Sequence, residues 1–122
     1  GSDITVFATG IMVFQALRAH EILREKGISV RVVNVSTIKP LHLEEVLKHI
    51  KDVKGIVTAE EHSIIGGLGS AIAETICDRM IPIKMIGIKD QFGQSARTHE
   101  ELLEYYGLTP QAIIKKIETL LE

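Results

Sequence analysis

The chain has 122 residues, the length of one domain, and its 45% hydrophobic and 25% charged residues exclude an intrinsically disordered protein. Its formal net charge is −2 and its basic residues are scattered, so no nucleic-acid-binding surface is expected. No apolar run approaches the roughly 18 residues that a membrane span needs.

The single cysteine, Cys77, has no partner for an internal disulfide. This is typical of proteins in a reducing compartment, so we expect a cytoplasmic location. Gly1-Ser2 resembles the remnant of an expression tag, and we expect residues 3–122 to form one domain. The mean hydropathy of +0.19 is high for a small domain, which predicts that an apolar surface contacts another chain or domain.

The first half of the chain alternates between short apolar runs and helical patterns. Ile4–Ala8 is predicted to be a buried strand, and Thr9-Gly10 a turn. Residues 11–26 form a predicted helix that Gly27 ends. Its core-facing residues are Met12, Val13, Ala16, Ala19 and Leu23. Next come a strand over 28–35, a helix over about 42–52 and a strand over 53–59.

The second half continues this alternation. Leu68, Ile72, Ile76 and Met80 recur at helical spacing, which predicts a helix that runs to Met80 and is ended by Pro82. A strand over 83–88 and a polar loop follow.

The chain then ends in two further helices. A short helix is expected over 99–106, followed by a terminal helix with Thr109 as its N-cap and Pro110 at its first position. The whole pattern predicts an α/β fold of three layers, with a mainly parallel sheet of four to five strands flanked by helices. The strand order is not determined by the pattern.

A glycine-rich corner follows the predicted third strand. Gly67-Leu68-Gly69-Ser70-Ala71-Ile72 has isoleucine where the dinucleotide-binding fingerprint needs glycine or alanine, and seven residues separate it from the predicted strand end. Three interpretations remain open. In the first, the glycines Gly66, Gly67 and Gly69 allow close packing of the helix. In the other two, the N–H groups of the helix start at Gly67–Ser70 bind an anion or a carboxylate of a partner protein.

Glu60, Glu61 and His62 lie in the same corner, where the third strand ends. Ligands of parallel sheets gather at that edge, and alternation would place Glu60 and His62 on one side. No second histidine or cysteine stands at metal-ligand spacing, so a metal site is not predicted. A general acid–base pair is possible, but capping of the next segment or contact with a partner chain is favoured.

The remaining histidines and the cysteine carry little chemical signal. His20 is interpreted as a histidine at the edge of the core. Cys77 is interpreted as a packing residue beside the apolar face of its helix. His42, His49 and His99 are placed at helix starts or on exposed faces. No catalytic set is therefore predicted within the chain.

Four stretches nevertheless resemble the C-terminal domain of transketolase and its thiamine-diphosphate-dependent relatives. They are ITVFATG, VRVVNVSTIKPLH, VTAEEHSIIGGLGSAIAE and DQFGQSARTHEELLEYYGLTPQAIIKKI, and together they span nearly all of residues 3–122. Asp90–Ser95 and Tyr106–Thr109 favour transketolase over deoxyxylulose-phosphate synthase and over 2-oxoacid dehydrogenase β subunits. Ala96 and His42 depart from the family pattern, without affecting the resemblance.

The resemblance implies the following role. Transketolases move a two-carbon ketol unit between sugar phosphates on thiamine diphosphate and a divalent metal such as Mg²⁺. The family binds both in domains other than this one, so no catalytic, cofactor-binding or metal-binding residue is assigned here. The chain is expected to be an inactive assembly domain, or part of a split enzyme's C-terminal subunit. Its expected partners are the N-terminal domains or subunit, in a homo-oligomeric, dimeric enzyme of the pentose phosphate pathway.

Other interpretations remain open beside this one. One alternative is membership of one of the two related thiamine-diphosphate enzymes. The chain is also consistent with a free-standing α/β module that binds an anion or a nucleotide at Gly66–Ser70. The candidate interface or anion site comprises Glu60, Glu61, His62, Gly66, Gly67, Gly69 and Ser70.

Overall fold

The computed structural model describes residues 3–35, 43–63, 67–88 and 107–122. Strands and helices alternate along these residues, as the sequence pattern predicts. In chain order the elements are β1 (Ile4–Ala8), α1 (Met12–Glu25), β2 (Val30–Asn34), α2 (Leu43–Ile50), β3 (Gly55–Ser63), α3 (Leu68–Thr75), β4 (Ile83–Ile88) and α5 (Pro110–Leu120).

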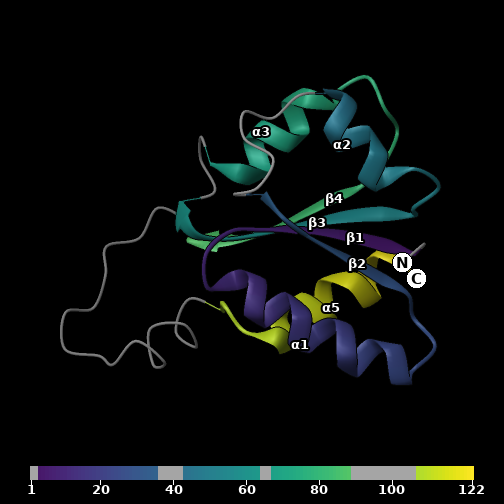
Figure 1. Ribbon diagram of the computed structural model, residues 1–122, viewed down its shortest axis with the longest axis vertical. Coiled ribbons are helices and arrows are strands. Elements are labelled where there is room, and N and C mark those ends of the chain that lie inside the picture. Colours follow the sequence, from purple (N-terminus) through teal and green to yellow (C-terminus); the bar gives the residue numbers. More distant parts are fainter. Residues whose placement is uncertain (1–2, 36–42, 64–66, 89–106) are drawn as a thin grey trace.

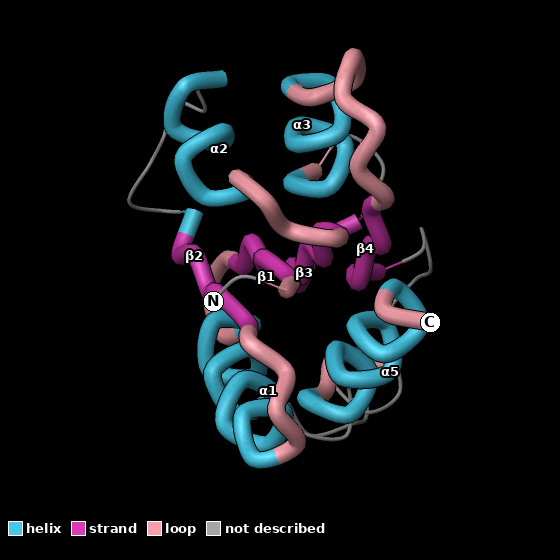
Figure 2. Tube along the Cα trace, turned by 90° about the vertical axis from the view of Figure 1, so that its right-hand side faces the viewer, coloured by secondary structure: helices cyan, strands magenta, loops and turns pink. Residues whose placement is uncertain are grey.

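The four described strands form one parallel sheet in the order β2-β1-β3-β4 (Figure 1). Helices α1 and α5 cover one face of this sheet, and α2 and α3 cover the other, so the fold has three layers (Figure 2). The predicted fold class is therefore confirmed, and the strand order is new information from the structure. The polar loop after β4 and the helix predicted over 99–106 lie outside the described residues.

The central strand β1 is buried on both faces, because helices cover both sides of the sheet. All five of its residues are buried, including Thr5, whose hydroxyl donates a hydrogen bond to the carbonyl oxygen of His49 on α2. One apolar cluster lies between the sheet and α1 and α5, and it includes Met12 and Ile117. A second lies under α2 and α3, around Phe7 and Ile72. The sheet thus separates two cores.

The predicted start of the terminal helix is confirmed at α5. The Thr109 hydroxyl accepts a hydrogen bond from the backbone N–H of Ala112 at 3.2 Å, and Pro110 follows directly. Gly107 has a φ of 71°, which suits glycine because it lacks a Cβ. Gly27, with a φ of 80°, likewise follows α1 as expected.

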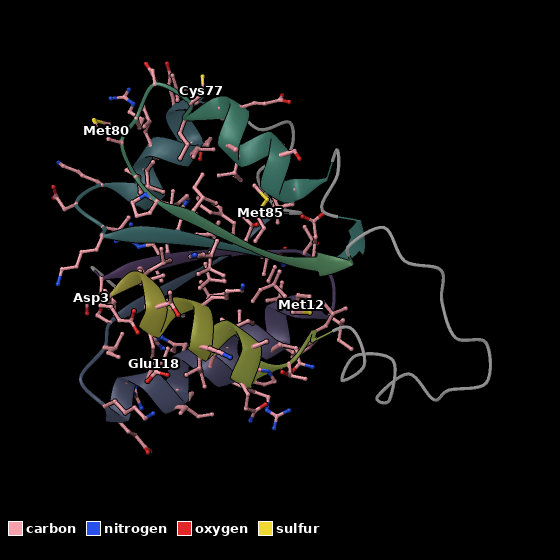
Figure 3. All side chains as sticks on the ribbon, turned by 180° about the vertical axis from the view of Figure 1, so that it is seen from behind. Asp3, Met12, Cys77, Met80, Met85 and Glu118 are labelled. Carbon is pink, nitrogen blue, oxygen red and sulfur yellow. The ribbon has the colours of Figure 1, made fainter. Side chains whose placement is uncertain are left out.

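The prediction for the helix after the glycines was wrong at its carboxyl end. Helix α3 ends at Thr75, Met80 is fully exposed, and Cys77 is exposed rather than packed beside the helix stripe (Figure 3). The last buried residue of this stripe is Ile76, and the Arg79 N–H donates to its carbonyl oxygen in a turn. A longer helix would gain no further burial, because the chain must descend to the sheet to begin β4 at Ile83.

Candidate functional site at the carboxyl end of β3

Strand β3 is longer than predicted and contains the whole Glu60-Glu61-His62 motif. It ends at Ser63 rather than Ala59, so three residues, not seven, separate the strand from Gly67. Its pairing with β1 is described as far as Ala59, whereas its pairing with β4 resumes at Ser63 after a register shift. The motif therefore lies on an irregular strand end at the carboxyl edge of the sheet, where parallel sheets bind ligands.

Glu60 is the best-defined polar residue of this corner. The residue is 2% exposed. Its Oε1 accepts a hydrogen bond from the N–H of Leu68, and its Oε2 accepts one from the N–H of Gly69, both at 2.9 Å. These are two of the first N–H groups of α3, which have no partner within the helix. Glu60 thus caps α3 from the neighbouring strand with both carboxylate oxygens.

The Glu60 carboxylate supplies, from within the protein, the negative charge that the start of a helix favours. A carboxylate near the N-terminus of a helix interacts favourably with the helix dipole, as a bound phosphate would. Gly67 is the N-cap residue and provides no side-chain cap of its own. The interpretation of Glu60 as a cap of the next segment is therefore confirmed for this residue.

Gly69 is required for the close approach of α3 to the sheet. A Cβ at this position would lie 2.6 Å from Sδ of Met85 and 2.9 Å from Oγ1 of Thr58. Both distances are far shorter than normal contacts, so a larger residue requires the Met85 and Thr58 side chains, or α3 itself, to shift. The close packing predicted for the glycines is confirmed here. Figure 3 shows Met85 on the α3 side of the sheet.

Thr58 is a site residue that the sequence analysis missed. It is fully buried two positions before Glu60 on β3, and its Oγ1 has no hydrogen-bond partner in the described structure. Thr58 and Met85 are unremarkable in sequence because each belongs to an apolar strand run. Their contact with Gly69 depends on the placement of α3 over β3 and β4.

The other predicted corner residues are less fully placed. Glu61 and His62 belong to β3 by their backbone, but their side chains lie outside the described part, and so does Gly66. Ser70 is half-buried in the first turn of α3. The predicted contact of these residues with a partner or an anion therefore stays a prediction.

The start of α3 is not suited to a second anion such as a diphosphate. Glu60 already binds two N–H groups at the start of α3, and a second anion there would meet its carboxylate. Within the four described ranges, no group of three or more His, Cys, Asp or Glu side chains is arranged to hold a metal ion. In the same ranges, no helix has the length and apolar character to cross a membrane.

The histidines outside the corner differ partly from expectation. His20 lies at the edge of the core as predicted, with its side chain 30% exposed, but its buried Nδ1 has no hydrogen-bond partner. His49 lies in the last turn of α2, half-buried, with its ring edge against Phe7 at 6.4 Å between centroids. Burial lowers the pKa of His49, and the nearby Arg31 and Lys48 lower it further, whereas Glu45 raises it.

Comparison with known proteins identifies the relatives of this chain. The family model described as transketolase, C-terminal domain, matches residues 1–113. A Methanocaldococcus jannaschii protein with the provisional name of transketolase C-terminal section is 51% identical over 119 residues, 96% of this chain and 36% of the relative. The 1-deoxy-D-xylulose-5-phosphate synthase of Trichormus variabilis is 36% identical over 119 residues, 96% of this chain and 19% of the enzyme.

A solved structure shows the same arrangement of elements. It is described as a split gene transketolase in an inactive beta4 tetramer. Its TM-score to this chain is 0.90 at 42% identity, over 99% of this chain and 40% of the solved chain. This chain thus spans 36% to 40% of the length of these two transketolase relatives.

Proposed function

Since the chain belongs to the transketolase C-terminal domain family, we propose that it is the assembly domain of a thiamine-diphosphate-dependent transketolase. In this proposal, other domains or subunits bind the thiamine diphosphate and its Mg²⁺. They also supply the groups that transfer the ketol unit between sugar phosphates. The chain alone is inactive.

The capping of α3 by Glu60 is the observation that carries this proposal. Ligands of parallel sheets bind at the carboxyl edge of the sheet. At this edge, the N–H groups of Leu68 and Gly69 already donate hydrogen bonds to the carboxylate of Glu60. The corner is therefore built to hold a packed surface in place. Glu61 and His62, which follow on the strand, are proposed to contact the neighbouring domain or subunit.

The same proposal extends to the complete enzyme. The likeness to a protein described as a split gene transketolase supports a two-chain enzyme in which this segment forms the C-terminal part of one chain. The full assembly is a homo-oligomer of such pairs, working in the pentose phosphate pathway. A cytoplasmic location is supported by the free, exposed Cys77, which a reducing compartment keeps as a thiol.

A reconstitution experiment tests the assembly role. Residues 3–122 replace the matched segment of the split gene transketolase chain, and the chimaera is combined with the complementary subunit. We expect ketol transfer between sugar phosphates to exceed that of the same chain without any C-terminal segment by at least about 100-fold. A folded, assembled chimaera with no activity would contradict the proposal.

The isolated chain provides the complementary test. Calorimetric titration with thiamine diphosphate and Mg²⁺, and with sugar phosphates and nucleotides, should show no binding at micromolar concentrations. Micromolar binding without a partner would instead support the free-standing module that binds an anion or a nucleotide at Gly66–Ser70.

A synthase role is the second candidate, and the match to 1-deoxy-D-xylulose-5-phosphate synthases is the observation that favours it. The segments that argue against it, Asp90–Ser95 and Tyr106–Thr109, lie largely outside the described residues. Assaying the reconstituted enzyme for 1-deoxy-D-xylulose 5-phosphate distinguishes the two. We expect ketol transfer without formation of this product.

A further inference from the structure

Helix α2 is held to the sheet through the backbone carbonyl groups of its last turn. The last four carbonyl groups of a helix have no partner within that helix. Here the Thr5 hydroxyl on β1 donates a hydrogen bond to the carbonyl oxygen of His49. The Arg31 guanidinium on β2 donates one to the carbonyl oxygen of Lys48 at 3.2 Å. Side chains of two strands therefore hold the carboxyl end of α2 in place.

The side chain of His49 lies at this attachment, between an apolar and a cationic group. The residue is half-buried, and its ring meets that of the core residue Phe7 at nearly a right angle. The charged groups that act on it are Arg31, Lys48 and Glu45, and Glu45 already pairs with Lys48 at 3.2 Å. Within the described residues, β1 and α3 pack beside α2 but add no charge that acts on His49. A proton on His49 therefore adds a third positive charge at a half-buried position.

Protonation of His49 favours movement of the whole last turn. Thr5 and Phe7 lie two positions apart on β1, so the hydrogen bond from Thr5 keeps the His49 ring on the sheet side of the helix. The guanidinium of Arg31 also stays close to the ring while it donates to α2. Burial, and then Arg31, lowers the pKa of His49 in this position. The proton therefore binds more tightly to a form in which the last turn has moved away and the ring is in water.

Few contacts oppose such a movement. Helix α2 has eight residues, of which only Val46 and Ile50 are buried. Between α2 and β3, Asp52 has a φ of 64°, a left-handed conformation that is unfavourable for a residue with a Cβ, and opening relieves it. We propose that protonation of His49 releases the carboxyl end of α2 from the sheet, so that this end of the helix opens reversibly at mildly acidic pH while α1 and α5 stay folded. The proposal does not depend on the proposed function.

Amide hydrogen exchange of the full chain, followed by NMR, tests this opening. The opening constant for residues 47–50 of α2, corrected for intrinsic exchange, should rise by about threefold or more from about pH 7.5 to about pH 5. The opening constants of α1 and α5, on the other face of the sheet, should not change. No rise in α2 overturns the proposal, because the ring then titrates without movement of the helix. An equal rise in all helices also overturns it, because that would be a general loss of stability.

Replacement of the histidine assigns the effect to one group. His49→Gln keeps a polar side chain that does not titrate, so it should abolish the rise of the opening constant in α2 at low pH. His20→Gln, on α1 across the sheet, is the matched control and should leave that rise unchanged. A rise that persists in His49→Gln overturns the proposal, and so does an NMR titration of the wild type that gives His49 a pKa of 6.5 or above.

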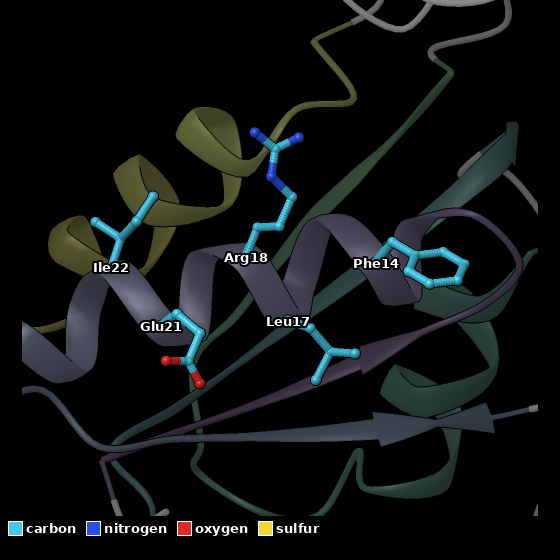
Figure 4. Close-up of a pocket in the computed structure, with 5 residues that line it drawn as sticks. All are labelled: Phe14, Leu17, Arg18, Glu21 and Ile22. Atoms are coloured by element: carbon cyan, nitrogen blue, oxygen red, sulfur yellow. The ribbon is translucent and has the colours of Figure 1, made fainter.

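Arg31→Met separates the charge of the guanidinium from its hydrogen bond. Loss of the bond to the Lys48 carbonyl oxygen should increase the opening of α2 already at neutral pH. Loss of the positive charge should make the further rise at low pH smaller than in the wild type. Arg18→Met removes an exposed arginine from α1 (Figure 4) and should change neither quantity. A larger rise at low pH in Arg31→Met than in the wild type contradicts the proposal.

Discussion

At the scale of single residues, Glu60 shows how one side chain links two elements. It stands on β3 but satisfies the N–H groups of Leu68 and Gly69 on α3, eight and nine residues later. Each bond joins a carboxylate oxygen to a buried backbone donor, and such bonds are stronger than bonds between neutral groups. The corner that looks like a ligand site in sequence is thus held by an internal contact.

Glu60→Gln should destabilise the chain by about 1–3 kcal/mol, because the amide presents an NH₂ group to one of two buried N–H donors. Urea unfolding measures this effect. Glu74→Gln, on the exposed face of α3, is the matched control and should change stability by less than about 0.5 kcal/mol. Equal effects for the two variants would mean that the capping bonds contribute nothing.

His49 makes stability depend on pH. Its pKa is lowered from 6.5 in the folded state, chiefly by burial and then by Arg31, so the unfolded chain binds the proton more readily. Stability from this group is therefore full above pH 6.5 and is lost as the pH falls through the lowered pKa. In urea unfolding from about pH 7.5 to about pH 5, His49→Gln should lose less stability than the wild type. An identical pH dependence would contradict this assignment.

At the scale of elements, the sequence predicted helix ends most reliably where they depend on hydrogen bonds between neighbouring residues. The Thr109 cap, the Pro110 start and the turn at Gly27 depend on residues within one turn of the chain, and all were predicted. The ends of β3 and α3 were not, because they depend on neighbouring strands. Residues beyond Ala59 remain in a strand since β4 pairs again at Ser63.

Thr109→Ala should destabilise the chain by about 1 kcal/mol, since the Ala112 N–H loses its cap. Thr119→Ala is a matched control on the same helix. Its hydroxyl donates to the Lys115 carbonyl oxygen on the exposed face, and its loss should be nearly neutral. Thermal unfolding compares the two variants, and a larger effect at Thr119 would contradict the importance of the cap.

At the scale of the whole molecule, one sheet joins two cores. The cluster around Ile117 and the cluster around Ile72 lie on opposite faces, but both rest on β1 and β3, the two central strands. Loss of either core exposes one face of strands that are apolar on both sides. The two halves should therefore unfold together.

Ile72→Ala and Ile117→Ala should each cost about 2–5 kcal/mol and lower the midpoint of one shared transition. Far-ultraviolet circular dichroism and NMR signals of core methyl groups should give coincident urea curves with an unchanged slope. Two separate transitions in either variant would show that the cores fold independently. Ile83→Val, at a half-buried position on β4, is a milder control.

The sequence by itself determined the alternation of strands and helices, the buried character of Ile4–Ala8 and the family motif around Glu60. These depend on periodicity and short-range bonding, which are properties of neighbouring residues. Only the tertiary structure decided the strand order, the bonding of Glu60 to α3, the close approach of Gly69 to Met85 and the exposure of Phe14 on α1. Each of these depends on which surfaces meet in space, and periodicity along the chain does not determine that.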